Sequence, residues 1–207
     1  AQDIYLTGNP QITFFKVVYR RHTNFSMESI QQTWNGNVDA TDGRCTSTIS
    51  RNGDLVHKMY IQVETNGSMS NINGGSDWIK TATLEIGGQQ IDKITGQWME
   101  VWSELTEPNP TGTTLNGSSN GTLFQNMTGF GGVLKAKSVN ASNIYVPLPF
   151  WFCRNPGLAL PLIALQYHEV KLVLEHGSRT SIDTVCTQNL WVDYIYLDTD
   201  ERRRFAQ

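Results

Sequence analysis

Four histidines and three cysteines are the side chains best suited to bind a metal ion. They are His22, His57, His168, His176, Cys45, Cys153 and Cys186. Zinc ligands usually recur within a few residues of one another, as in Cys-x-x-Cys or His-Glu-x-x-His, and the sequence contains neither motif. The acidic residues Asp198, Asp200 and Glu201 lack the glycine and the spacing of a calcium loop. We therefore expect no bound metal and no other cofactor.

Glycine-rich segments are the places where a backbone can bind phosphate groups. Gly87–Gly88 and Gly129–Gly132 are such segments, but neither is part of Gly-x-x-x-x-Gly-Lys-Ser/Thr, the pattern that holds a nucleotide. Both are better explained as turns. With neither a metal motif nor a phosphate loop, we predict that the protein is not an enzyme.

Two basic clusters, Arg20–His22 and Arg202–Arg204, are the segments that an anionic partner would contact. The chain has a formal net charge of -3 and a pI near 5.8, without the basic excess that binding to a phosphate backbone normally needs. Acidic residues precede the second cluster, which favours local ion pairing or a protein interface. We predict no direct nucleic-acid binding.

Six Asn-x-Ser/Thr sequons are potential glycosylation sites, at Asn24, Asn66, Asn116, Asn120, Asn126 and Asn140. Many such motifs arise by chance in a chain this rich in Asn, Ser and Thr. The odd number of widely spaced cysteines favours reduced thiols made in the cytosol, where the standard secretory machinery does not act. Asn66, Asn116, Asn120, Asn126 and Asn140 are the candidate glycosylation sites.

No segment has the features of a signal peptide or of a membrane span. The start, AQDIYLTGNP, lacks a basic and then apolar region, and no apolar run approaches the roughly 18 residues needed to cross a bilayer. We expect no transmembrane segment.

The elements that position these residues are predicted to be mostly β-strands. About a third of the 207 residues are Gly, Thr, Ser or Asn, a bias toward turns and half-exposed strands. The clearest strands, by alternation of apolar and polar residues, are Tyr167–Glu175 and Leu190–Leu197. Six more are expected at Phe25–Trp34, Cys45–Ser50, Leu55–Glu64, Ile79–Ile86, Gln89–Ile94 and Asn143–Phe152. These eight strands predict an all-β, jelly-roll sandwich with short helices in its loops.

Turns and loops connect these strands. Arg51–Asp54 is predicted to be a turn with positive φ, and Gly87–Gly88 a two-residue hairpin turn. Asn66–Asp77 and Thr106–Ser142 are long polar loops.

Two segments are candidate helices. Apolar residues recur at helical spacing over Thr95–Leu105, which predicts a helix with its tryptophans against the sheet. Ile12–Arg20 is predicted to be a helix opened by Pro10, with a strand as the alternative because its residues are strand-prone.

Three segments strongly resemble the major capsid proteins of large icosahedral double-stranded DNA viruses of the chlorovirus, iridovirus and phycodnavirus kind. They are Asp3–Trp34, Asn143–Leu172 and Val192–Gln207. The resemblance spans almost the whole chain and is weakest in the loops. It implies a first jelly roll over 25–199, an N-terminal segment over 1–24, and a connector over 200–207 toward a second jelly roll.

The resemblance also implies the partners. Three chains would form a pseudo-hexagonal capsomer, a homotrimer, which contacts neighbouring capsomers and minor capsid proteins in a virion made in the host cytoplasm. The long loops would face outward, with glycans that viral enzymes can attach outside sequons. Phe14, Phe15, Tyr19, Arg202, Arg203 and Arg204 are the candidate interface residues. The alternative is a carbohydrate-binding single jelly roll, in which Trp78, Trp151 and Trp191 stack on sugars.

Overall fold

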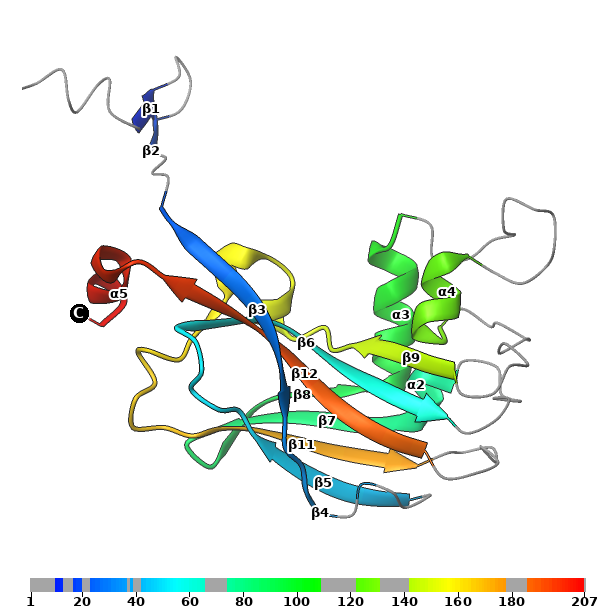
Figure 1. The fold of residues 1–207 in the computed structure, drawn as a ribbon. Coiled ribbons are helices and arrows are strands. Elements are labelled where there is room, and N and C mark those ends of the chain that lie inside the picture. The colour runs from blue at the N-terminus through cyan, green and yellow to red at the C-terminus, as the bar shows by residue number, and fades with distance from the viewer. Residues whose placement is uncertain are drawn as a thin grey trace, which may run out of the picture.

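A computed structural model of the chain describes residues 10–12, 17–19, 23–36, 38, 42–65, 74–108, 122–130, 142–177 and 186–206. Two antiparallel sheets lie face to face, with three helices at one end of the sandwich and a fourth at the other end (Figure 1). No helix among these residues is both long and apolar enough to span a membrane.

The first sheet has the order β10-β6-β12-β3, with β9 also paired to β6. Its strands are β3 (Phe25–Gln32), β6 (Leu55–Thr65), β9 (Ser142–Pro147), β10 (Leu160–Pro161) and β12 (Cys186–Leu197). The second sheet has the order β4-β5-β11-β7-β8. Its strands are β4 (Asn35–Gly36), β5 (Asp42–Thr48), β7 (Ile79–Ile86), β8 (Gln89–Thr95) and β11 (Val170–Gly177).

The connections between strands repeatedly cross from one sheet to the other. The chain passes from β3 to β5, back to β6, across to β7, and finally from β11 to β12. Apart from the two-residue strands β4 and β10, each sheet has four strands, and every predicted strand overlaps an observed one. The predicted all-β jelly-roll sandwich is therefore confirmed.

The core lies between the sheets and is built from alternate residues of their central strands. Leu190, Val192 and Tyr194 of β12 are 0% exposed, as are Ile61 and Val63 of β6. Burying an aliphatic side chain of this size stabilises the fold by roughly 1.5–3 kcal/mol. The one polar atom of Tyr194 has a partner, because its hydroxyl donates to the carbonyl oxygen of Ser50 at 2.6 Å.

The hairpin between β7 and β8 forms where the sequence predicts it. Gly87 and Gly88 have φ angles of 61° and 80°, the left-handed pair that a two-residue hairpin turn needs. The N–H of Gly87 also donates to the carbonyl oxygen of Glu169, which fixes the turn to the start of β11.

The N-terminal helix predicted over Ile12–Arg20 is wrong. Pro10–Ile12 forms β1 and Val17–Tyr19 forms β2, and the two pair as antiparallel strands. The strand-prone residues therefore outweigh the helix-opening position of Pro10, as the alternative interpretation proposed.

The chain bends at Arg51–Asp54 as predicted, but the positive φ angle predicted for this turn is wrong. Gly53 is absent from the glycines with positive φ, and the segment does not close a hairpin, because β5 and β6 belong to different sheets. Glycine is needed there for space: a Cβ atom on Gly53 would lie 2.7 Å from the Cβ of Tyr194. The chain thus passes over the core tyrosine as it crosses between sheets.

Helix α3 (Gly96–Thr106) confirms the predicted helix, whereas its orientation is opposite to the prediction. Thr95 caps it by accepting from the N–H of Trp98 at 3.2 Å. Met99 and Ser103 are the buried side chains, at 1% and 4% exposed, while Trp98 is 40% and Leu105 73% exposed. Trp98 is therefore turned away from the sheet, whereas Trp102 is half-buried beside β6.

The other helical segments were not predicted from the sequence. They are α2 (Gly74–Trp78), α4 (Leu123–Thr128), η1 (Trp151–Cys153), η2 (Pro156–Leu158) and α5 (Thr199–Ala206). Thr122 and Gln125 form a capping box at the start of α4, with each side chain accepting from the backbone of the other.

Candidate functional site

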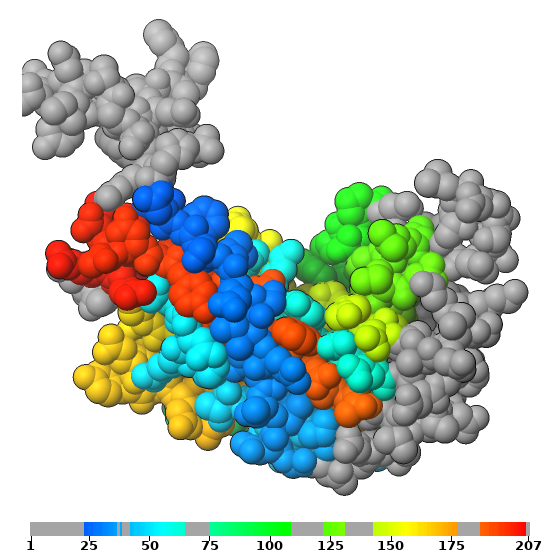
Figure 2. All heavy atoms as spheres, in the orientation of Figure 1, coloured from blue at the N-terminus to red at the C-terminus, as the bar shows by residue number. Residues whose placement is uncertain are grey.

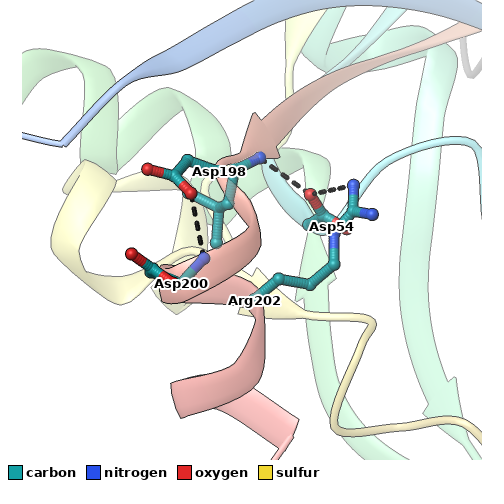
Figure 3. A network of polar contacts seen from close by, with 5 residues as sticks. Asp54, Asp198, Asp200 and Arg202 are labelled. Carbon is teal, nitrogen blue, oxygen red and sulfur yellow. Dashed lines mark hydrogen bonds and ion pairs between the residues drawn. The ribbon is translucent and has the colours of Figure 1, made fainter.

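The predicted basic cluster Arg202–Arg204 lies on α5, where Arg202 is already occupied by an internal contact. Its guanidinium binds both oxygens of Asp54, Nε to Oδ1 at 3.0 Å and Nη2 to Oδ2 at 3.1 Å (Figure 3). The N–H of Leu197 also donates to Asp54 Oδ2, at 2.7 Å. Asp54 is only 8% exposed, so these partners satisfy a nearly buried carboxylate. Arg202 therefore ties α5 to the sandwich.

The remaining charges of α5 suit its ends. The carboxylate of Asp198 accepts from the N–H of Asp200 at 2.9 Å, next to the first turn, which carries Asp200 and Glu201 (Figure 3). Arg203 and Arg204 lie in the last turn, an arrangement that complements the helix dipole. Arg204 contacts Glu201 at 3.3 Å, and both arginines are exposed. All three arginines of the predicted basic cluster are thus exposed, and Arg202 also binds Asp54.

An exposed apolar face next to α5 was not predicted. Ile30 of β3 pairs with the core residue Val192 and is half-buried, so its side chain points inward. Phe25 and Met27 take the alternate positions, point outward, and are 63% and 50% exposed. Alternation in the sequence shows that these two side chains share a face, but it does not show which face is covered.

Phe205 adds to the exposed apolar surface at this end of the molecule. Leu197 pairs with Phe25, so α5 starts beside the first residue of β3 (Figure 1). Phe205 on α5 is 42% exposed. Because β3 is also the edge strand of its sheet, the outer edge of β3 has no partner strand among the described residues.

The other predicted interface residues cannot be compared with this face. Phe14 and Phe15 lie outside the described residues. Tyr19 lies in β2, of which only the backbone is described.

Only one of the five candidate glycosylation sites lies in the described part of the chain. Asn126 is on α4, half-buried, and its Nδ2 donates to the carbonyl oxygen of Thr122 at 3.0 Å. Asn66, Asn116, Asn120 and Asn140 lie outside the described residues. The sixth sequon residue, Asn24, is exposed immediately before β3.

The described histidines and cysteines do not gather into a metal site: no group of three potential ligands occurs among the described residues. His176 is 0% exposed and stacks on Trp78, with ring centroids 5.2 Å apart. His168 precedes β11, because that strand begins at Val170, and it is exposed.

Cys45 and Cys153 are free thiols in an environment that suppresses reactivity. Burial raises the pKa of both Cys45 and Cys153 to about 12, so both stay protonated at neutral pH. These thiols lack the lowered pKa of a catalytic nucleophile.

One motif escaped the sequence analysis: Gly117–Gly121 reads GSSNG and matches the Gly-x-Ser-x-Gly pattern of esterase nucleophiles. That pattern has meaning only at a strand-to-helix turn of an α/β sheet. Gly117–Gly121 lies outside the described residues, and the described fold is an antiparallel sandwich.

The three tryptophans proposed as sugar platforms do not form such a surface. Trp78 is 2% exposed, and its indole N–H donates to Gln188 at 2.9 Å. Trp191 is half-buried and donates to Gln62 at 2.7 Å, while half-buried Trp151 packs edge-on against Phe152. The carbohydrate-binding alternative, which depended on these three tryptophans, is therefore not supported.

Comparison with protein families gives a match over nearly the whole chain. A family profile described as "Major capsid protein N-terminus" matches residues 13–198. The chain is 52% identical to the major capsid protein of Pyramimonas orientalis virus, over 100% of this chain and 53% of that relative. It is 44% identical to the major capsid protein of Paramecium bursaria Chlorella virus 1, over 100% of this chain and 48% of that relative. The chain thus spans about half the length of these relatives.

Solved structures give the same similarity in three dimensions. The crystal structure of PBCV-1 VP54, fitted into a reconstruction of the virophage Sputnik, matches with a TM-score of 0.75 and 39% identity. That match covers 94% of this chain and 48% of the solved chain. The Faustovirus major capsid protein matches with a TM-score of 0.57 at 12% identity, a likeness of fold alone.

Proposed function

This chain belongs to the major capsid protein family of large DNA viruses, and from this premise we propose that it is a structural subunit of an icosahedral virus shell. The proposal is carried by the family match over residues 13–198. Its role is to supply a rigid shape and adhesive surfaces, with no substrate and no cofactor.

We further propose that three chains form a pseudo-hexagonal capsomer, which then contacts neighbouring capsomers and minor capsid proteins. A ring of three needs two different patches on each chain, one that meets the next chain and one that meets the previous chain. Exposed Arg203 and Arg204 are candidates for such contacts, together with Phe14, Phe15 and Tyr19. The particle would be assembled in the host cytoplasm.

The domain organisation that we propose has a first jelly roll over 25–199 and a connector over 200–207 that leads into a second jelly roll. Two observations support it. The chain spans 53% and 48% of two relatives, which leaves room for a second domain of similar size. Exposed Phe25, Met27 and Phe205 lie at the end of the molecule where α5 leads on, and a second domain there would cover them.

Glycans are proposed for the polar segments Asn66–Asp77 and Thr106–Ser142 of the sequence. Exposed polar loops tolerate such additions, whereas the strands of the sandwich do not. Asn66, Asn116, Asn120, Asn126 and Asn140 stay candidate positions.

Electron microscopy and intact mass measurement of the source particle test this function. We expect hexagonal arrays of trimeric capsomers, built from a protein of about twice the 23.2 kDa of this chain. Chemical cross-linking of the full-length protein should stop at three chains. A monomeric protein of about 23 kDa, absent from the shell, would contradict both the capsid role and the second domain.

A further inference from the structure

A cleft between α3 and β6 is lined by residues that the assembly role does not explain. It has a volume of about 460 Å³, within the range of roughly 300–1,000 Å³ that is typical of small-molecule sites. Figure 2 shows the hollow between α3, in green, and β6, in cyan. The strand and helix that flank it come from distant parts of the sequence.

The floor and walls of this cleft are mostly apolar. Its floor consists of the buried side chains Met59, Met99, Ser103, Phe130 and Leu148. Ser103 is the polar one, and its hydroxyl is satisfied by donating to the carbonyl oxygen of Glu100 at 2.7 Å. Half-buried aromatic rings of Tyr60, Trp102 and Phe124 form the walls. An apolar chain or ring placed there would replace water at this surface.

The backbone around the cleft is held open by local constraints. Pro147 and Pro149 flank Leu148 and fix the backbone angle φ at both positions. The N–H of Leu148 donates to the carbonyl oxygen of Met59 at 3.0 Å, which attaches this segment to β6. The cleft is therefore preformed, which reduces the entropic cost of binding.

The rim of the cleft carries two cations that form no ion pair with any residue in the described part of the chain. The guanidinium of Arg154 lies 4.2 Å from the centroid of the Trp102 ring. Stacking occupies the flat face of a guanidinium and leaves its N–H edges free to donate. Lys58 lines the same rim, and in the described part of the chain neither Lys58 nor Arg154 forms an ion pair. Glu107 is the single acidic lining residue, so the cations outnumber it.

We propose that this cleft binds a small amphiphile with an anionic head group, its apolar part against the aromatic walls and its head at Arg154 and Lys58. The chemistry recognised is a carboxylate or phosphate attached to an alkyl chain, as in a free fatty acid or a membrane lipid. Ligand binding at this cleft would be a property in addition to the structural role, and it does not require the shell to be assembled.

Binding of decanoate and of decanol to the full-length protein tests the proposal, with Trp102 fluorescence and calorimetry as readouts. Decanoate should bind once per chain and more tightly than decanol, which has the same chain length but no charge. Arg154→Gln and Lys58→Gln should each weaken decanoate binding about fivefold, equivalent to about 1 kcal/mol, and leave decanol unaffected. Both residues are exposed, so the fold should survive the substitutions.

Lys93→Gln is the matched control, because Lys93 is exposed on β8 in the other sheet and the substitution removes the same charge. It should leave decanoate binding unchanged. Vesicles of anionic phosphatidylglycerol distinguish a membrane lipid from a free fatty acid as the ligand. If the protein binds the vesicles and Arg154→Gln abolishes this binding, the ligand is a membrane lipid. If the protein binds decanoate but not the vesicles, the ligand is a free amphiphile. The proposal would be overturned if decanol and decanoate bound with equal affinity, or if neither bound. It would also be overturned if Lys93→Gln weakened decanoate binding as much as Arg154→Gln and Lys58→Gln do.

Discussion

Arg202 and Asp54 form a two-point ion pair, at 3.0 and 3.1 Å, although 148 positions separate them in the chain. The two partners are unequally exposed: Asp54 is 8% exposed as a residue, whereas the side chain of Arg202 is 51% exposed. Removing the carboxylate should therefore cost more than removing the guanidinium, because water can partly replace only the exposed partner.

The first prediction follows from this inequality. Asp54→Ala should lower the free energy of unfolding by about 2–3 kcal/mol, because the N–H of Leu197 loses its acceptor in a nearly buried site. Arg202→Ala should cost about 1 kcal/mol or less, the usual range for an exposed ion pair. Urea unfolding measures both values. Arg203→Ala, on the same helix, is the control. If Arg203→Ala lowered the free energy of unfolding as much as Asp54→Ala, the stabilising role of the contact between Arg202 and Asp54 would be contradicted.

A second prediction concerns the core strand β11. Leu172 is 0% exposed, and Leu172→Asp should lower the free energy of unfolding by at least about 4 kcal/mol, because it combines a cavity with an unpaired buried charge. Thr48→Asp is the matched control, since Thr48 is exposed on the neighbouring strand β5. Thermal denaturation of both variants gives the comparison. A stable Leu172→Asp variant would mean that Leu172 does not lie in the core. Ile195 is 7% exposed but pairs with the outward-facing Met27, outside the core cluster, so Ile195→Asp should cost less than Leu172→Asp.

A third prediction is an acid-dependent loss of stability at His57. This residue is 6% exposed, and neither ring nitrogen has a hydrogen-bond partner in the described structure. Burial lowers the pKa of His57 below its usual 6.5; Lys58 lowers it further, whereas Asp193 acts in the opposite direction. The unfolded chain takes up a proton as the pH falls below about 6.5, whereas the folded chain takes it up only at lower pH, so stability falls as the pH drops below that value.

Melting temperatures at pH 7.5 and 5.5 measure this effect. The natural protein should lose more stability over this interval than His57→Leu, which has no proton to bind. His168→Leu serves as the control, because it removes an exposed histidine and leaves the buried His57 in place. Equal pH dependence in the natural protein and in His57→Leu would exclude His57 as the source.

The fourth prediction concerns thiol reactivity. With a pKa of about 12, Cys45 and Cys153 should react with iodoacetamide at pH 8 about a thousand times more slowly in the folded protein than in urea. Mass spectrometry of the labelled peptides measures each site separately. Rapid labelling of Cys153 in the native state would show that its environment opens to water.

The sequence predicted the strands well, because their signals are local. Gly87 and Gly88 supply the positive φ angles that their turn needs, and alternation located β11 and β12. The orientation of α3 was not predictable in the same way. Periodicity groups Trp98 and Trp102 on one face, but the face turned inward is decided by Gly96, where a Cβ atom would lie 2.0 Å from the carbonyl oxygen of Ser76.

The position of α5 and the lining of the cleft depend on contacts between residues that are far apart in the sequence. No local sequence pattern predicts such contacts. The sequence of α5, TDERRRFA, has no apolar stripe, and the bond from Arg202 to Asp54 holds it in place. The cleft draws its residues from β6, α3, α4 and the segment around η1. Only folding brings Lys58, Trp102 and Arg154 together, so single-sequence analysis could not find them.

The central position of β12 determines how the molecule bears mechanical load. β12 pairs with β6 on one side and with β3 on the other, along most of its 12 residues, and α5 follows it directly. Ladder hydrogen bonds run perpendicular to the strands, so tension along β12 from its C-terminal end loads them together, in shear. They do not open one after another, as they would if the strand were peeled from an edge. Force applied through α5 is therefore distributed across the whole first sheet.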